Sequence, residues 1–131
     1  MALQLEPHQG QAGQAPLSVD NLFALIKTGP AWAVLLDGRV VAIGGHTPIW
    51  PGRTILWGYL GSDCGPALRR MTKEVRQQVA ELSVEFPRME AYAERNHVNG
   101  HQWLKLLGFK SEGLMRKFYN GRDYVLYSKV T

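Results

Sequence analysis

The stretch that most constrains the fold is the C-terminal run of residues 99–127, NGHQWLKLLGFKSEGLMRKFYNGRDYVLY. Trp103, Leu104 and Leu107 lie at spacings that place them on one face of a short amphipathic helix. Gly108 follows directly and tolerates the positive φ angle with which many helices end. The run therefore predicts a helix that stops at a glycine and leads into further structure.

A long two-stranded hairpin is expected after this helix, which covers residues 100–107. The two strands cover about residues 109–119 and 124–130. Asn120-Gly121, between them, is a dipeptide that favours a two-residue hairpin turn. The C-terminal part of the chain is thus predicted to be a helix followed by two antiparallel strands.

The segments before this run also have clear periodicity and turn residues. They predict helices over residues 17–28 and 66–86, strands over 54–60 and 89–94, and a hairpin over 31–45 that turns at Asp37-Gly38. Pro48 and Pro51 are expected to keep the loop after this hairpin from extending either strand. The order predicts an α+β fold with a mixed central sheet of about six strands and three to four helices.

Length and composition indicate one domain. Of the 131 residues, 45% are hydrophobic and 20% charged, so we expect a single domain over residues 17–131 after a flexible segment over residues 1–16. The sequence has neither a signal-peptide core nor an apolar run of roughly 18 residues, so we expect a cytoplasmic protein without a membrane partner. Cys64 is the single cysteine, which excludes an internal disulfide and a multi-cysteine metal site.

The net charge of +4 is compatible with nucleic acid or with one heavily phosphorylated cofactor. Arg69, Arg70 and Lys73 begin a basic stripe, but Glu74 and Glu81 interrupt it. No helix-turn-helix, zinc or RNA-binding pattern accompanies the stripe. A solvated helix face is the favoured interpretation, and we do not expect nucleic acid as a partner.

The turn before the long helix is a candidate anion site. A strand leads through Gly61 into a helix that starts at Gly65-Pro66, and such a helix start presents free backbone N–H groups that suit a pyrophosphate. Asp63 brings a negative charge close by, which Arg69 and Arg70 could offset. An ordinary helix start without a ligand is the alternative.

The order of elements and the LLGF run resemble the GNAT family of N-acetyltransferases from the family's second strand onward, with an abbreviated N-terminus. In that family the turn before the long helix holds the pyrophosphate of acetyl-CoA under the pattern Q/R-x-x-G-x-G/A. Ser62 stands at the Gln/Arg position, and Gly65 and Ala67 stand at the small-residue positions. The resemblance implies acetyl-CoA as cofactor, with binding residues Tyr59, Leu60, Ser62, Cys64, Gly65, Ala67, Arg70 and Asn99.

A second family pattern, N-x-x-A-x-x-x-Y-x-x-x-G-F, falls on the short helix. Gly108 and Phe109 match the Gly-Phe pair, whereas Leu104 stands at the position of the catalytic tyrosine. His97 stands at the asparagine position, and Asn99 nearby offers an amide. The tyrosine that protonates the leaving thiolate in the family is therefore absent from its usual position.

Acyl transfer to an amine also needs a group that takes the amine's proton. Glu94 and His97 are the candidate catalytic residues, with His101 close to them in the sequence. The alternative is that these polar side chains at a strand end are simply solvated.

Two functions follow from the resemblance. The first is an acyl-CoA-dependent N-acetyltransferase that acts on an unidentified amine, so that its partners are a coenzyme A thioester and an amine acceptor. The alternative is a catalytically degenerate binding or structural protein, similar to compact GNAT-like proteins carried by tailed bacteriophages. A homodimer is left open in both cases.

Overall fold

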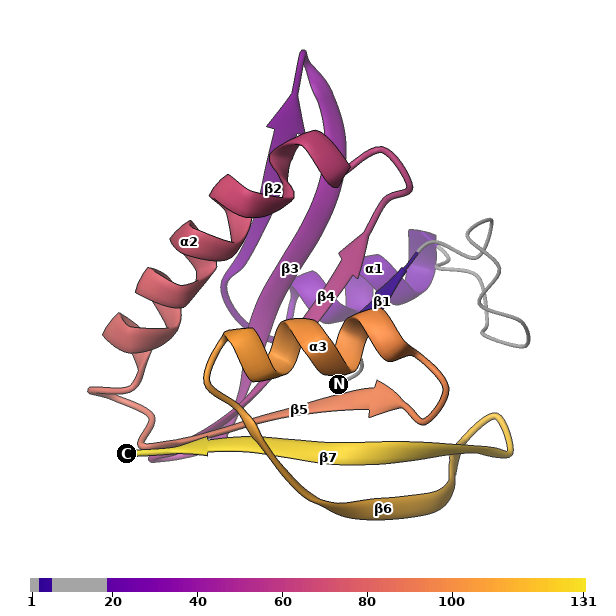
Figure 1. Ribbon diagram of the computed structural model, residues 1–131. Helices are drawn as coiled ribbons and strands as arrows, with labels where there is room; N and C mark the ends of the chain where they lie inside the picture. Colours follow the sequence, from indigo (N-terminus) through magenta and orange to yellow (C-terminus); the bar gives the residue numbers. More distant parts are fainter. Residues whose placement is uncertain (1–2, 6–18) are drawn as a thin grey trace.

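The computed structural model describes residues 3–5 and 19–131 of the chain. Within these residues, seven strands form one mixed sheet: six follow the order β2-β3-β4-β5-β7-β6, and β1 pairs with β4 beside this path (Figure 1). The strands are β1 (Leu3–Leu5), β2 (Ala31–Leu36), β3 (Arg39–Trp50), β4 (Arg53–Leu60), β5 (Arg88–Glu94), β6 (Lys110–Tyr119) and β7 (Arg122–Val130). The helices are α1 (Val19–Ile26), α2 (Gly65–Leu82) and α3 (Val98–Leu106). The predicted α+β fold with a mixed sheet is confirmed.

Two helices cover one face of the sheet and form the core with it. The apolar stripe of α2 buries Met71, Val75 and Val79, and α3 buries Trp103 and Leu104 in the same cluster. The strands contribute alternate residues to this cluster because successive side chains of a strand point to opposite faces. The hydrophobic core therefore lies between the sheet and the pair α2 and α3.

The expected three to four helices require a correction. Among the described residues, only α2 and α3 supply buried helical side chains to the core. The third helix, α1, has eight residues, and its described apolar side chains Phe23 and Ile26 are 57% and 43% exposed. Two helices thus build the domain with the sheet.

Both predicted hairpin turns are confirmed. Asp37 and Gly38 have φ angles of 51° and 80°, and Asn120 and Gly121 have φ angles of 51° and 70°. Two successive positive φ angles define the turn whose twist matches that of paired antiparallel strands. These turns fix the registers of β2 with β3 and of β6 with β7 at their tips.

The prediction that Pro48 would keep the strands from extending was wrong, whereas Pro51 does lie in the turn between β3 and β4. β3 continues through Pro48, which pairs with Thr54 of β4. Because β2 pairs with β3 only as far as Gly45, the outer edge of β3 is not needed for a ladder at Pro48. Proline is tolerated at such an edge, and the turn forms later, at Gly52 with a φ angle of 87°.

The predicted glycine stop of α3 is confirmed. The Gly108 N–H donates to the Lys105 carbonyl at 3.0 Å, and the Phe109 N–H donates to the Leu104 carbonyl at 3.0 Å. Gly108 has a φ angle of 94°, so the chain leaves the helix in the left-handed region. This cap directs the chain from α3 into β6.

Replacing this glycine should destabilise the fold. In Gly108→Ala the new Cβ meets ordinary contacts only, but the φ angle of 94° disfavours any L side chain. We expect the free energy of unfolding, measured with urea, to fall by about 1–2 kcal/mol. Gly65→Ala is the control, because nothing lies within 4 Å of its Cβ and its φ angle is not positive. Equal losses in both variants would contradict this interpretation of the cap.

Candidate functional site

The central feature of the sheet is a gap between β4 and β5. These parallel strands pair only where they begin, from Arg53 with Arg88 to Ile55 with Glu90. Beyond that point β4 stays paired with β3, and β5 stays paired with β7, along their remaining lengths. The two halves of the sheet therefore diverge toward the C-terminal ends of β4 and β5.

Strand β1 occupies this gap. Leu3, Gln4 and Leu5 pair in parallel with residues 58–60 of β4, and β1 also lies against β5 and α3. The other edge of β4 is taken by β3, so β1 must lie on the side that faces β5. The sequence analysis did not predict this strand; the other residues of the segment 1–16 lie outside the described part of the chain.

The first turn of α2 lies at the end of β4. Cys64 occupies the N-cap position, and its side chain makes no capping hydrogen bond. The Cys64 N–H donates to the Gly61 carbonyl at 3.2 Å, and nothing lies within 4 Å of a Cβ built on Gly65. The approach to the backbone at Gly65 is therefore open, where the positive end of the helix dipole favours an anion.

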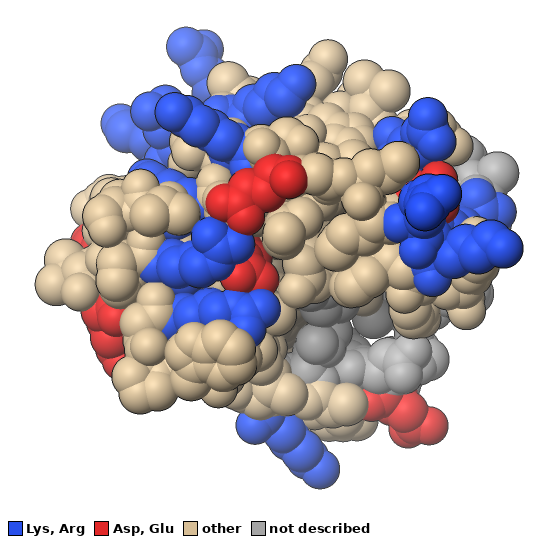
Figure 2. All heavy atoms as spheres, turned by 90° about the horizontal axis from the view of Figure 1, so that it is seen from below, with Lys and Arg blue, Asp and Glu red and all other residues tan. Residues whose placement is uncertain are grey.

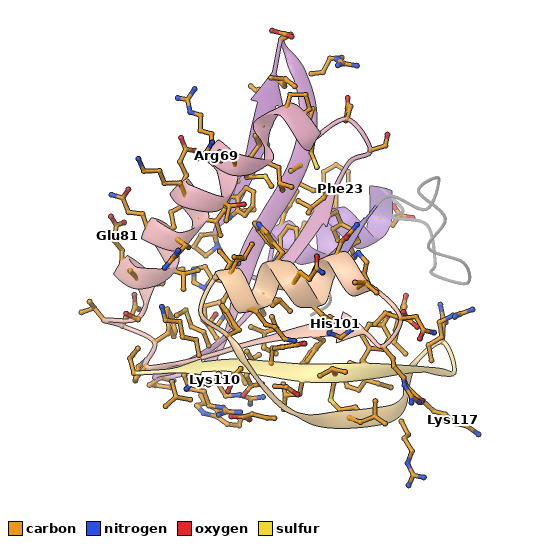
Figure 3. The ribbon with its side chains drawn as sticks, viewed as in Figure 1. Phe23, Arg69, Glu81, His101, Lys110 and Lys117 are labelled. Carbon is orange, nitrogen blue, oxygen red and sulfur yellow. The ribbon has the colours of Figure 1, made fainter. Side chains whose placement is uncertain are left out.

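The acidic residue in this turn is neutralised by a basic residue that is distant in the sequence. Asp63 pairs with Arg39 of β3 at 3.3 Å. Arg70 instead pairs with Glu74 at 3.3 Å within α2, and its side chain is 87% exposed. Arg69 also points away from the sheet (Figure 3). The charge of Asp63 is therefore compensated by Arg39, a pairing that the sequence did not indicate.

The cysteine in this turn does not have the environment of a nucleophile. Cys64 is buried, and burial raises the pKa of its thiol, with the nearby Asp63 raising it further. A reactive cysteine needs the opposite shift. Of its predicted neighbours in the site, Ser62 is exposed and Ala67 is half-buried.

Glu94 and His97 lie at the open end of β5. Glu94 is 5% exposed, its Oε2 accepts the Asn96 N–H at 2.8 Å, and its Oε1 lies 4.0 Å from Arg122. His97 is 1% exposed at the start of α3, whereas the predicted amide residue Asn99 is exposed. Ala93, the residue before Glu94 in β5, packs in the core under α2 and α3. Because side chains alternate along a strand, Glu94 lies on the opposite face of the sheet.

His101 has a structural role. Its Nε2 lies 3.0 Å from the carbonyl oxygens of both Glu94 and Arg95, and its Nδ1 lies 2.7 Å from the Tyr127 hydroxyl. Because carbonyl oxygens only accept, Nε2 carries a proton, and Nδ1 shares a hydrogen bond with the Tyr127 hydroxyl. The ring therefore joins the end of β5 to α3 and β7, and both of its nitrogens are engaged.

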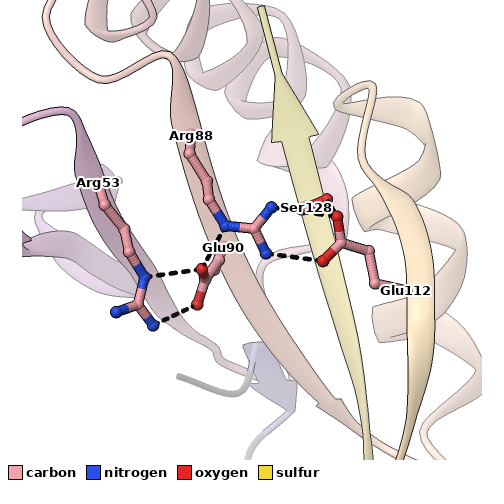
Figure 4. A network of polar contacts seen from close by, with 5 residues as sticks. All are labelled: Arg53, Arg88, Glu90, Glu112 and Ser128. Carbon is pink, nitrogen blue, oxygen red and sulfur yellow. Dashed lines mark hydrogen bonds and ion pairs between the residues drawn. The ribbon is translucent and has the colours of Figure 1, made fainter.

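An ion-pair network closes the other end of the gap (Figure 4). Arg53 of β4 donates from Nε and Nη2 to the two oxygens of Glu90 in β5, both at 2.8 Å. Arg88 bridges Glu90 at 2.6 Å to Glu112 of β6 at 2.7 Å, and Ser128 of β7 donates to Glu112. Glu90 is 4% exposed, and its hydrogen bond with Arg53 lowers the pKa of its carboxyl group.

A separate cavity of about 480 Å³ lies between α2, α3 and the sheet. It is lined mainly by apolar and aromatic side chains, among them Trp32, Leu56 and Trp103. His46 lines it too; its Nδ1 lies 2.8 Å from the Thr54 hydroxyl, and burial lowers the pKa of its imidazole. This cavity lies on the helix-covered face, away from the first turn of α2.

The described residues include no group of three or more His, Cys, Asp and Glu side chains placed to hold a metal ion. In this part of the chain, no helix combines the length and apolarity required to cross a membrane. Figure 2 shows most Lys and Arg in two groups separated by uncharged surface, with acidic side chains among them and a further basic side chain at the lower edge.

The sequence alone matches no protein-family model and no curated protein. The fold, however, matches solved structures. A ribosomal-protein-alanine N-acetyltransferase from Brucella melitensis superposes with a TM-score of 0.69 at 16% identity, over 89% of this chain and 81% of that one. An acetyltransferase of the GNAT family from Bacillus anthracis gives 0.69 at 11% identity, over 92% and 79%.

A further match is the microcin C7 self-immunity acetyltransferase MccE, solved with acetyl-CoA and AMP. Its TM-score is 0.68 at 17% identity, over 85% of this chain and 66% of that one. The chain has the GNAT fold. At these identities the likeness establishes the fold, and the chemistry must be argued from the site itself.

Within the GNAT fold, the position of the family's tyrosine is apolar. Leu104 is 2% exposed and packs in the core, so it offers no hydroxyl. Strand β4 has one tyrosine, Tyr59, on the part of the strand that lies along the gap. Its pKa is raised to about 12, first by burial and then by the nearby Tyr119 and Tyr124. Sequence reasoning named Tyr59 for its backbone only, because the proximity of these tyrosines depends on strand order.

The network at the closed end should make stability depend on pH through Glu90. Because the folded-state pKa is lowered from 4.5, the stabilisation is present above that value and is lost as the pH falls through the folded-state pKa. In Glu90→Gln we expect the free energy of unfolding at pH 7 to fall by about 1–3 kcal/mol. The difference from the wild type should shrink at pH 3.

The control for this prediction is Glu74→Gln. Glu74 pairs with the 87% exposed Arg70, so its loss should change stability by less than about 0.5 kcal/mol. Urea unfolding of both variants at the two pH values is the measurement. A Glu90→Gln variant that behaves like the control would show that the network does not hold β4 to β5.

Proposed function

We infer that the protein transfers an acetyl group from acetyl-CoA to an amine. The observation that carries this proposal is the gap between β4 and β5, which ends at the uncapped first turn of α2. The structural neighbours support it, since they are acetyltransferases and one was solved with acetyl-CoA.

Binding of the cofactor would use backbone groups more than side chains. The first turn of α2 at Gly65 would hold the pyrophosphate, with the adjacent Ser62, Cys64 and Ala67 shaping the turn. The backbone of Tyr59 and Leu60 would pair with the pantetheine arm, because their edge of β4 is not paired with β5. Arg70 and Asn99 are exposed and would act on the outer parts of the cofactor.

When bound, acetyl-CoA supplies an activated acyl carbon to the amine. The acceptor nitrogen forms a bond to the carbonyl carbon while the carbon–sulfur bond breaks. Glu94, whose side chain lies on the face away from the helices, is the group that takes the proton released by the amine. Tyr59 lies on the same face across the gap, and its raised pKa keeps its hydroxyl protonated to donate to the leaving thiolate.

Ligand binding should stabilise the folded chain. Acetyl-CoA at about 100 times its Kd should raise the free energy of unfolding by roughly 2.7 kcal/mol, seen as a higher Tm. Release of free thiol with peptides that start with alanine, chosen because of the Brucella melitensis neighbour, then measures turnover. A Tm unchanged at millimolar acetyl-CoA would remove the proposal, and binding without turnover on any amine would favour a degenerate binding protein.

The charge at the first turn of α2 gives a sharper test. Nothing lies within 4 Å of a Cβ at Gly65, so Gly65→Asp and Gly65→Asn should both fold. The aspartate should leave stability unchanged or raise it by up to about 1 kcal/mol through the helix dipole. It should also repel the phosphates and weaken coenzyme A binding by at least about tenfold relative to the asparagine variant, measured by calorimetry. Equal Kd values would place the pyrophosphate elsewhere.

A further inference from the structure

Strand β1 uses the part of β4 that the proposed function assigns to the cofactor. Leu3 pairs with Gly58, Gln4 with Tyr59 and Leu5 with Leu60. The opposite edge of these β4 residues is already paired with β3. The groups on the β5 side of β4 are therefore the ones that β1 occupies.

Each backbone N–H donates one hydrogen bond, and a strand directs alternate groups to each edge. A second extended guest cannot take the same edge of β4 while β1 is in place. The pantetheine arm contains two amide groups and is such a guest. The gap is thus suited to an extended amide chain, whether that chain is a peptide strand or a cofactor arm.

We propose that Leu3–Leu5 occupies the cofactor's place on β4 within the chain, and that β1 must leave before coenzyme A enters. This proposal rests on the proposed function and adds regulation of the same site. An occupant tethered to the chain raises the apparent Kd of the cofactor by a constant factor, whatever the protein concentration.

Strand β1 is short and weakly paired, so it can be displaced. It has three residues, and its ladder with β4 is parallel, a pairing slightly weaker per residue than an antiparallel one. The other six strands of the described sheet have six to twelve residues each. Opening of such a short element costs little compared with unfolding of the domain, so a ligand can replace it.

The test uses proline to weaken β1 in the full chain. Adjacent strand residues direct their N–H groups to opposite edges, so Gln4→Pro with Leu5→Pro removes at least one N–H donor that faces β4 and weakens the ladder. Gln11→Pro with Ala12→Pro is the matched control, because both residues follow β1 in the sequence. Neither pair alters a residue that the proposed function places in the site.

Calorimetry with coenzyme A gives the first readout. If β1 fills the gap about nine-tenths of the time, about one-tenth of the molecules can bind coenzyme A, and the apparent Kd of the wild type is raised about tenfold. The Gln4/Leu5 variant should therefore bind with a Kd lowered by about tenfold. The control variant should bind like the wild type. Equal Kd values in all three proteins would overturn the proposal while leaving the proposed function intact.

Amide exchange followed by NMR gives the second readout. In the wild type, coenzyme A should speed exchange of the amides of residues 3–5, while those of residues 58–60 stay protected by the new guest. Amides of residues 3–5 that stay protected at saturating coenzyme A would also overturn the proposal. If no variant binds coenzyme A, the proposed function itself fails, and this inference falls with it.

Discussion

The structure depends on the bidentate pair between Arg53 and Glu90, which joins β4 to β5 where their pairing ends. A buried carboxylate needs compensation, and two arginines, Arg53 and Arg88, supply it. Arg88 extends the network to β6 through Glu112. Since each strand keeps its own antiparallel partner beyond this point, the sheet is held at one end of the gap and opens at the other.

The open end brings together the parts that a thioester ligand would need. The backbone edge of β4 leads to Gly65 at the uncapped start of α2, where Arg39 compensates the charge of Asp63. Glu94 and Tyr59 lie on the sheet face away from the helices, on either side of the gap. Chemistry on that face does not require a tyrosine at position 104. The residue there, Leu104, packs in the core instead.

Local features of the fold could be predicted from the sequence, because they depend on neighbouring residues. The turn at Asp37-Gly38, the buried stripe of α2 and the glycine cap at Gly108 are of this kind. Contacts between distant residues were missed. The pairing of Asp63 with Arg39, the cluster of Tyr59 with the tyrosines of the last hairpin, and the strand Leu3–Leu5 depend on strand order and register, which no single segment encodes.

The central claim is that the gap between β4 and β5 is the ligand site, and a crystal structure with coenzyme A tests it most directly. The pyrophosphate should lie against the first turn of α2 at Gly65, and the pantetheine arm should pair with residues 58–60 of β4 in place of β1. A coenzyme A molecule bound instead in the cavity beside Trp103, or β1 still paired with β4 beside the bound ligand, would contradict it.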